Sequence, residues 1–228
     1  MCGRFGLFTD LFELVELLGF EIGMLADDYA PRWNIAPTTS VLALRGEDGE
    51  RLGSFMRWGL IPRWAKPESA FKRPMFNARS ETVAERPTFR DSFIARRCLI
   101  PANGFFEWQR DASGKGSPWW IHATDSGVIT FAGIWSIWNG PDGTIESCAI
   151  LTTEPNGLMK RIHDRMPVIL DEDWADVWLD DAADKDALLE ACKSREWPMM
   201  EAREANPAVG STRNDGPHLI DPPPRLFD

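Results

Sequence analysis

The chain contains few of the residues that mark secreted, membrane-spanning or metal-binding proteins. Its 228 residues include four cysteines, three histidines and one tyrosine, and no CxxC pair occurs. Cysteines that lie so far apart predict neither a zinc site nor a disulfide framework. No apolar run reaches the ~20 residues of a membrane helix, and no apolar stretch follows a basic start, as a signal peptide requires. We therefore expect a cytoplasmic protein with reduced thiols, no metal and no membrane contact.

Common catalytic signatures are missing as well. The sequence contains no P-loop, no GxGxxG turn, no HExxH helix and no GxSxG elbow. These motifs mark phosphate binding, dinucleotide binding, zinc peptidases and serine hydrolases respectively. Their absence leaves no sequence support for those classes, and we expect no cofactor.

The charge is distributed unevenly. The net charge of −10 taken alone argues against nucleic-acid binding. Residues 57–97, however, carry ten basic and four acidic side chains, a net charge of +6, which leaves −16 on the rest of the chain. A basic segment in an acidic protein predicts a local anion-binding face, although the same charges also suit an ordinary solvated surface.

Short apolar runs separated by turn signals predict a fold rich in strands. The expected strands are a hairpin formed by SVLALR and RLGSFMRW within 40–58, and runs at about 97–102, 104–110, 117–123, 128–135, 145–152 and 166–170. Prolines predict a loop at 59–80, and PRWNIAPT at 31–38 is expected to be irregular. The fold class that this pattern predicts is α+β, one domain over 1–228 with a mainly antiparallel sheet curled into a barrel.

Helices are expected to be short and peripheral. The first should follow an N-cap at Thr9 and end at Gly19. Further helical segments are expected at 88–96 and 154–161, and two acidic helices within 172–192. The tail from about residue 215, which contains PPP, is expected to be loosely packed.

Cys2 is the first candidate for chemistry. A small second residue predicts removal of Met1, which leaves an amine and a thiol on one residue. An α-amine titrates near ~8 rather than the ~10.4 of lysine, so part of it is neutral at pH 7. A neutral amine forms a Schiff base with an aldehyde, and the thiol can then close a five-membered thiazolidine. Position alone is equally compatible with a chance cysteine.

Three polar residues are candidates to assist Cys2. His163, in RIHDRMP, can shuttle protons, or it can be a turn residue bonded to Asp164. Glu107, in GFFEW, shares a strand face with Phe105, which would withdraw its carboxylate from water. Asn77, in FNARSE, can orient a substrate or the chain terminus, or it can cap a turn.

Aromatic and basic residues interleave in RWGLIPRW at 57–64. Flat stacking surfaces combined with cations are how proteins hold single-stranded nucleic acid. In a chain with eleven tryptophans, these rings are also compatible with an aromatic core.

Six segments of the chain form a recognisable set: MCGRF (1–5), WNIAPT (33–38), WGLIPRW (58–64), FNARSET (76–82), CLIPANGFFEW (98–108) and IHDRMPVIL (162–170). Taken together, these segments closely resemble the SOS-response-associated peptidase (SRAP) family of abasic site processing proteins. They cover about 170 residues in the order expected of that family.

The resemblance implies a barrel-like sheet and a covalent thiazolidine link between Cys2 and the ring-opened sugar of an abasic site in single-stranded DNA. Asn77, Glu107 and His163 match the polar residues that line this site. The positions that match DNA contacts are Arg4, Pro37, Trp58, Trp64, Arg79 and Arg165. The resemblance also implies autoproteolytic removal of Met1 and eventual reversal of the crosslink. We expect a monomer whose partner is single-stranded DNA with abasic sites.

Two other readings remain open at this point. In an N-terminal-nucleophile peptidase or amidohydrolase, Cys2 would attack a carbonyl with its own amine as the base. Such enzymes usually expose the nucleophile by removing a propeptide, whereas Cys2 directly follows Met1. A non-catalytic reader of modified DNA bases would need the basic aromatic segment but no free amino group on Cys2.

Overall fold

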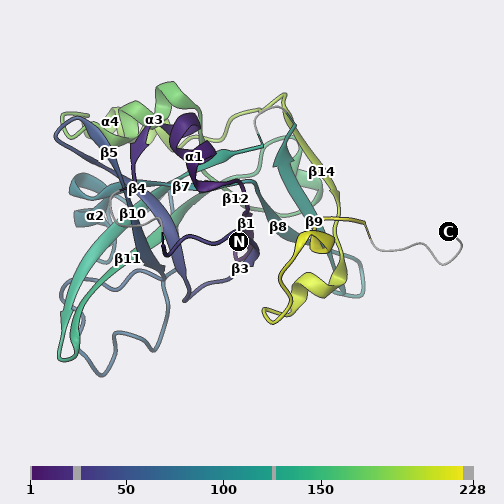
Figure 1. The fold of residues 1–228 in the computed structure, drawn as a ribbon, viewed down its shortest axis with the longest axis horizontal. Coiled ribbons are helices and arrows are strands. Elements are labelled where there is room, and N and C mark those ends of the chain that lie inside the picture. The colour runs from purple at the N-terminus through teal and green to yellow at the C-terminus, as the bar shows by residue number, and fades with distance from the viewer. Residues whose placement is uncertain (1, 23–26, 125–126, 223–228) are drawn as a thin grey trace, which may run out of the picture.

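A closed barrel forms the larger half of the molecule. The computed structural model describes residues 2–22, 27–124 and 127–222 (Figure 1). Five strands pair in a ring, because β11 pairs with β10 and also, in parallel, with β5. The strands of this ring are β11 (Gly143–Thr153), β10 (Ile129–Gly140), β7 (Arg97–Ala102), β4 (Ser40–Glu47) and β5 (Glu50–Trp58). Apart from the β11–β5 contact, the ring is antiparallel.

Shorter strands extend the barrel sheet. β6 (Asn77–Arg79) lies parallel to β11, with Asn77 opposite Ile150. The others are β2 (Phe20–Glu21), β12 (Met166–Pro167) and β13 (Ile169–Leu170), which pair with β5, β11 and β10 respectively.

A second, antiparallel sheet brings the N-terminal strand beside the GFFEW segment. Its order is β14 (Met200–Glu204), β9 (Gly116–Ala123), β8 (Gly104–Arg110), β1 (Phe5–Leu7) and β3 (Arg32–Ile35). Figure 1 shows β1 between the barrel strands and β9 and β14. Only Asn103 separates β7 of the barrel from β8, so the chain passes directly from one sheet to the other.

Two residues fix this passage. The Asn103 side chain accepts hydrogen bonds from the backbone N–H groups of Phe8 (2.7 Å) and Thr9 (3.1 Å), which ties it to the end of β1. At Gly104, a Cβ atom would lie 2.5 Å from the carbonyl oxygen of Ile121, so only glycine allows β8 and β9 to approach this closely. The segment after Gly104 is therefore held in a defined position beside the N-terminus.

Short helices lie on the outside. They are α1 (Leu11–Leu18), α2 (Arg90–Ala95), α3 (Glu172–Leu179) and α4 (Lys185–Ala191), with 3₁₀ turns at Met159–Arg161, Pro207–Gly210 and Pro217–Leu219. α3 and α4 contact each other, and α3 also packs on β7, β10 and β13. The main core joins the barrel strands to the second sheet and the helices, and it includes Trp58, Phe93, Phe105 and Phe131, each fully buried.

The predicted α+β fold with a barrel-like sheet is confirmed, and most predicted strands lie within a few residues of the observed ones. The predicted hairpin is β4–β5, and Asp48 (φ 52°) and Gly49 (φ 83°) form its turn in the left-handed region. The predicted cap is wrong by one residue. Asp10 accepts the cap hydrogen bond from the N–H of Phe12 (2.9 Å), because Thr9 is already bonded to Asn103.

Several predictions need correction. The strand expected at 166–170 is two short strands, because Val168 bonds to both β11 and β10 at the break. The helix expected at 154–161 is only the 3₁₀ turn at Met159–Arg161. The irregular segment contains β3, and the loop at 59–80 contains β6, whose backbone pairing is with a distant strand. β14 was not predicted.

The described part of the C-terminal tail is packed rather than loose. Leu219 is fully buried in a cluster with Phe106 and Trp120. Asp215 accepts a hydrogen bond from the backbone N–H of Trp33 over 2.6 Å. Residues 215–222 therefore cover one face of the second sheet, and residues 223–228 lie outside the described residues.

Candidate functional site

Cys2 lies fully buried where three chain segments meet. On one side, β1 pairs with β8, and the N–H of Phe106 donates to the carbonyl of Arg4 over 2.9 Å, which places the N-terminal residues along GFFEW. On another side, the Asn77 side-chain amide donates to the carbonyl oxygen of Cys2 over 2.8 Å. The prediction that Asn77 orients the chain terminus or a substrate therefore has a concrete partner, the Cys2 backbone.

The Cys2 thiol is held in its protonated form. Burial raises its pKa well above the usual range, and the nearby Glu107 carboxylate raises it further. The positive charge of the amino terminus and a hydrogen bond from the backbone N–H of Arg4 offset only part of this rise in pKa. Activated cysteine nucleophiles show the opposite behaviour, with a lowered thiol pKa in an electropositive setting. The sulfur at this site therefore needs a proton acceptor before or while it reacts.

Glu107 acts on the Cys2 thiol, and His163 faces Glu107. Nε2 of His163 lies 3.8 Å from Oε2 of Glu107, an ion-pair distance. The Glu107 residue is only 3% exposed, whereas the His163 side chain is 25% exposed. The expected contact of His163 with Asp164 also exists, with 2.9 Å between Nδ1 and Oδ1. The imidazole therefore links a buried carboxylate to the surface.

Arg165 is occupied by a carboxylate in this state. Its guanidinium forms two hydrogen bonds to Glu81, of 2.5 and 2.9 Å, and a third of 2.6 Å to the carbonyl of Thr152. The hydrogen bond from Arg165 is the main cause that lowers the pKa of Glu81. This two-pronged geometry is also the one in which arginine holds phosphate. Arg165 is thus placed near His163 with its charge already balanced.

The two predicted tryptophan contacts differ sharply. Trp58 is fully buried, and its Nε1 donates to the carbonyl of Phe76 over 2.8 Å, so its ring has no face for a base; the expectation that it contacts DNA is wrong. The reason is barrel closure, because the pairing of β5 with β11 turns Trp58 inward. Trp64 is 65% exposed and remains available for stacking. Pro37 is half-buried in the connection between β3 and β4.

Basic side chains line two grooves that share Thr88. The first, of about 510 Å³, includes Asn77 and therefore begins next to Cys2; its arginines are Arg79 and Arg86. The second, of about 350 Å³, includes Trp64, and its charged lining residues are Arg63, Arg96 and Asp91. The two grooves together carry four arginines and one aspartate, so part of the basic segment lines both of them.

Several buried polar atoms near this surface have no hydrogen-bond partner among the described residues. They are the hydroxyl of Thr152, Oδ1 of Asn77, and Nε of Arg4, Arg96 and Arg165. Thr152 pairs with Arg79 between β11 and β6, so its side chain projects on the same face as those of Asn77 and Arg79. Buried polar atoms are normally satisfied, so these groups are available to water or to a ligand. Sequence reasoning missed Thr152, which lies in an ordinary strand pattern.

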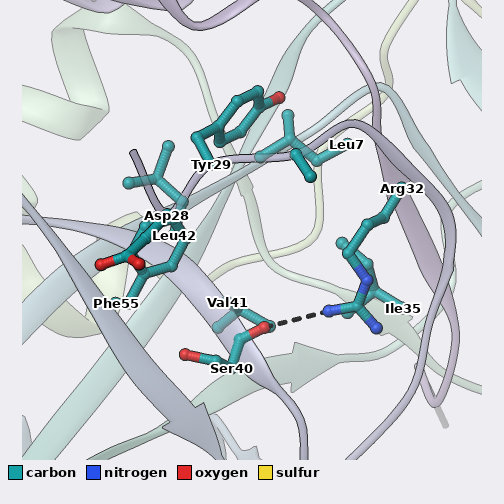
Figure 2. A pocket seen from close by; sticks show the side chains of 10 residues that line it. Leu7, Asp28, Tyr29, Arg32, Ile35, Ser40, Val41, Leu42 and Phe55 are labelled. Carbon is teal, nitrogen blue, oxygen red and sulfur yellow. Dashed lines mark hydrogen bonds between the residues drawn. The ribbon is translucent and has the colours of Figure 1, made fainter. Parts of the chain in front are cut away.

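Another pocket, of about 340 Å³, is unrelated to this centre (Figure 2). Its polar side chains are partly paired: the Tyr29 hydroxyl donates to the Thr9 carbonyl over 2.5 Å, and Arg32 donates to the Ser40 carbonyl over 3.2 Å. None of the described residues predicted for the site lines it. Its apolar lining consists of Leu7, Ala30, Ile35, Val41, Leu42 and Phe55.

The described ranges contain no group of three or more His, Cys, Asp or Glu side chains that could hold a metal ion. Within the same ranges, no helix is long and apolar enough to cross a membrane.

Fold and site together define a barrel-based α+β protein with a buried cysteine centre at its N-terminus. The chain belongs to the SRAP family: the family model described as SOS response associated peptidase matches residues 1–212. The resemblance drawn from the sequence motifs is thereby confirmed.

Related proteins support this assignment. The chain is 39% identical over 224 residues to the abasic site processing protein YoqW of Bacillus subtilis (strain 168), which covers 97% of this chain and 99% of YoqW. It is 35% identical over 196 residues to the abasic site processing protein HMCES of Xenopus tropicalis, covering 72% and 58% of the two chains. A crystal structure of a protein from Bacteroides thetaiotaomicron, 23% identical, has the same fold with a TM-score of 0.88 over 97% of this chain and 99% of that one.

Proposed function

We propose that this protein processes abasic sites by linking itself covalently to them through Cys2. After Met1 is removed, the α-amine and thiol of Cys2 form a thiazolidine with the ring-opened abasic sugar in single-stranded DNA. The observation that carries the proposal is the grouping around Cys2: the Asn77 amide bonds to its backbone, Glu107 lies near its thiol, and His163 contacts Glu107. The relatives named abasic site processing proteins support the substrate class.

The reaction balances without any oxidant or reductant. The Cys2 amine adds to the sugar aldehyde, and the resulting carbinolamine loses water to give an imine. The sulfur then adds to the imine carbon, the carbon–nitrogen π bond breaks, and the thiol proton ends on the nitrogen. One aldehyde and one aminothiol therefore give one thiazolidine and one water. The amine makes the first attack, because only the imine that it forms gives the sulfur a carbon on which to close the five-membered ring.

Glu107 and His163 are suited to the proton transfers. Glu107 is close enough to the Cys2 sulfur to raise its pKa, so its carboxylate can take the thiol proton as the carbon–sulfur bond forms. His163 contacts Glu107 and is partly exposed, so it can protonate the leaving hydroxyl of the carbinolamine and exchange its proton with solvent. Positioned acid–base groups typically contribute ~10²–10⁴-fold to a rate.

DNA would reach the site along the arginine-lined grooves. Asn77 and Arg79 lie in the groove that begins at Cys2, and Trp64 offers an exposed ring in the adjoining one. Arg4, with a buried Nε that lacks a hydrogen-bond partner among the described residues, is suited to a phosphate beside the lesion. Arg165 would contact a phosphate only when Glu81 releases it.

Removal of Met1 is part of the proposal, because the ring needs a free amine on Cys2. We assign this step to the same centre by hydrolysis of the Met1–Cys2 bond, and reversal of the crosslink to the opposite sequence of proton transfers. A peptidase that uses a Cys2 thiolate is disfavoured by the raised thiol pKa. The chemistry requires reduced cysteines, which fits the free state of all four and the expected cytoplasmic location.

A denaturing gel with an abasic oligonucleotide tests the proposal. Wild-type protein should give a heat-stable, slower-migrating adduct, and Cys2→Ala should give none. Cys148→Ala, which removes another fully buried thiol, is the matched control and should retain the adduct. No adduct from the wild type, or an undiminished one from Cys2→Ala, would contradict the proposal.

A further inference from the structure

The segment between β5 and β6 is an anchored arm. Trp138 of β10 holds it, since its Nε1 donates to the carbonyl of Ala65 over 2.7 Å. The same indole packs with the buried Ile61 and Ala70. We call residues Pro62–Pro74 the basic arm. Because Trp138 fastens it at several points, the side chains that it displays have defined positions.

The basic arm exposes two aromatic rings, Trp64 at 65% and Phe71 at 50%. A single exposed ring is ordinary on a protein surface, so what matters here is that the two rings lie on one basic segment. Phe71 is also held in place: its ring meets Trp138 edge to face, with centroids 5.7 Å apart and an interplanar angle of 85°. The Arg57 guanidinium lies 5.5 Å from the Phe71 centroid. Phe71 is therefore a half-exposed ring that is already ordered before any ligand binds.

The chain segment that carries Phe71 is mainly positive. The stretch from Arg57 to Pro74 contains one acid, Glu68, and five basic residues, which are Arg57, Arg63, Lys66, Lys72 and Arg73. One further acid faces the ring, since Asp142 lines a small pocket of about 170 Å³ together with Phe71 and Trp138. This environment favours a ligand that combines flat rings with negative charge.

We propose that Phe71 is a second base-stacking platform for single-stranded DNA, outside the lesion site. A nucleobase stacks on the exposed part of the Phe71 ring, and the phosphates beside it meet Lys72 and Arg73. This inference rests on the proposed function, because the same strand must enter the groove at Cys2. The surface around Phe71 continues toward other predicted DNA contacts. Trp64 lies on the same basic arm as Phe71. Arg57, which lies over the Phe71 ring, also donates to the carbonyl of Thr38 (2.8 Å), the residue after Pro37.

Nucleic acid fits this surface better than an apolar protein segment does. An apolar partner would have to bury Lys72 and Arg73 without compensating charge, which is costly. Single-stranded DNA supplies a phosphate for each cation and a ring for Phe71, the combination found in sequence-tolerant binding of single strands.

Fluorescence anisotropy with two 20-mers separates stacking from charge. One oligonucleotide carries thymine at every position, and the other is a baseless strand of tetrahydrofuran residues, which has no aldehyde. Phe71→Ala and Phe71→Leu should weaken binding to the thymine strand by between about fivefold and about 150-fold, the range for one lost base stack. Binding to the baseless strand should be unchanged, and Phe71→Trp should restore the affinity.

Ile94→Ala is the matched control, because Ile94 is 52% exposed on α2 and lies outside the basic arm. Phe71→Leu keeps an apolar contact with Trp138 and tests the inference even if Phe71→Ala unfolds. Wild-type affinity in a folded Phe71→Leu variant would overturn the inference. Equal losses on both strands would also overturn it, since stacking needs bases.

A crosslinking assay distinguishes a wrong assignment of Phe71 from a wrong proposed function. With a saturating short abasic oligonucleotide, the final adduct yield of Phe71→Leu should equal that of the wild type. A normal yield with unchanged affinity for the thymine strand would refute the platform alone. No adduct from the wild-type protein would refute the proposed function. It would also remove the reason for expecting that the strand on Phe71 continues into the groove at Cys2.

Discussion

The Asn77 amide donates a 2.8 Å hydrogen bond to the carbonyl oxygen of Cys2, which joins β6 to the N-terminal end of the chain. This contact is to backbone and not to the thiol, so Asn77 fixes where the amine and sulfur lie without changing their chemistry. β6 is itself held by its parallel pairing with β11, in which Asn77 lies opposite Ile150. The barrel thereby positions an otherwise free terminus.

Replacing Asn77 with alanine should slow crosslinking without weakening DNA binding. Asn77→Ala removes the donor to Cys2, a hydrogen bond worth about 1 kcal/mol of stability, and lets the terminus leave its reactive position. Single-turnover crosslinking at saturating abasic DNA should be slower, whereas the affinity for intact DNA should stay within about twofold. Asn77→Asp, which has the same size but no donor, should slow crosslinking at saturating DNA as Asn77→Ala does, although its added negative charge in the groove also weakens DNA binding. A wild-type rate in both variants would remove Asn77 from the site.

Replacing Glu107 should lower the thiol pKa of Cys2. The Glu107 carboxylate raises this pKa, so the neutral amide in Glu107→Gln should shift thiolate formation to lower pH. Thiolate absorbance in a pH titration measures the shift, and the same titration of Cys2→Ala identifies the signal. Crosslinking should nevertheless slow by ~10²–10⁴-fold, because the proton acceptor is lost. Unchanged titration and rate together would show that Glu107 does not act on the sulfur.

His163→Ala should slow crosslinking or its reversal by a similar factor, while affinity for intact single-stranded DNA stays the same. His218→Ala is the control, because it also removes a histidine but from the 3₁₀ turn Pro217–Leu219, which is not one of the segments that form the site. If His163→Ala forms and reverses the crosslink at wild-type rates, the 3.8 Å contact between His163 and Glu107 has no catalytic role.

Releasing Arg165 should strengthen DNA binding. Glu81→Gln removes the carboxylate that now holds Arg165, and the freed guanidinium can neutralise one more phosphate. The log–log salt slope should steepen by ~0.7, the value per phosphate on single strands. Glu85→Gln makes the same charge change on an exposed residue of the same segment and should have a smaller effect. Equal affinities of the two variants would argue against competition between Glu81 and phosphate.

The ion pair between Arg165 and Glu81 predicts that the stability difference between the wild type and Glu81→Gln depends on pH. The folded-state pKa of Glu81 is lowered, so the pair stabilises the protein above the unfolded pKa of a glutamate, ~4.3, and loses this contribution as pH falls through the folded value. Glu81→Gln should therefore be less stable than the wild type at pH 7, by under about 1 kcal/mol for a half-exposed pair. The difference should shrink in acid, as thermal unfolding at several pH values would show.

Arg79 should contribute to backbone binding and Lys185 should not. Arg79 is exposed in the groove that includes Asn77, whereas Lys185 begins the acidic α4. Arg79→Ala should weaken binding to single-stranded DNA and flatten the salt slope by ~0.7. Lys185→Ala, the charge-matched control, should change neither. A salt-independent affinity, or equal losses from both variants, would place the DNA on another surface.

Local patterns determined what could be predicted from the sequence. Turn signals bounded β7 and β8 correctly, and the aromatic neighbours of Glu107 correctly indicated a buried carboxylate. Contacts between distant segments were not predictable in this way. The three residues of β6 form a strand only because β11 lies beside them, and the pairing of Arg165 with Glu81 joins residues 84 positions apart.

Trp58 shows the same limit for a single residue. Its motif resembles a DNA-contacting segment, but the β5–β11 pairing that closes the barrel places the ring in the core. A motif therefore indicated the correct family without telling which of its aromatic residues are exposed.

Intact mass spectrometry of the adduct tests the central claim most directly. Wild-type protein incubated with an abasic oligonucleotide should give one species, with the mass of the protein without Met1 plus the oligonucleotide minus one water. Borohydride should not change this mass, because a thiazolidine has no imine to reduce, and peptide mapping should place the DNA on Cys2. An adduct that retains Met1, survives only after borohydride reduction, or maps to a residue other than Cys2 would contradict the account.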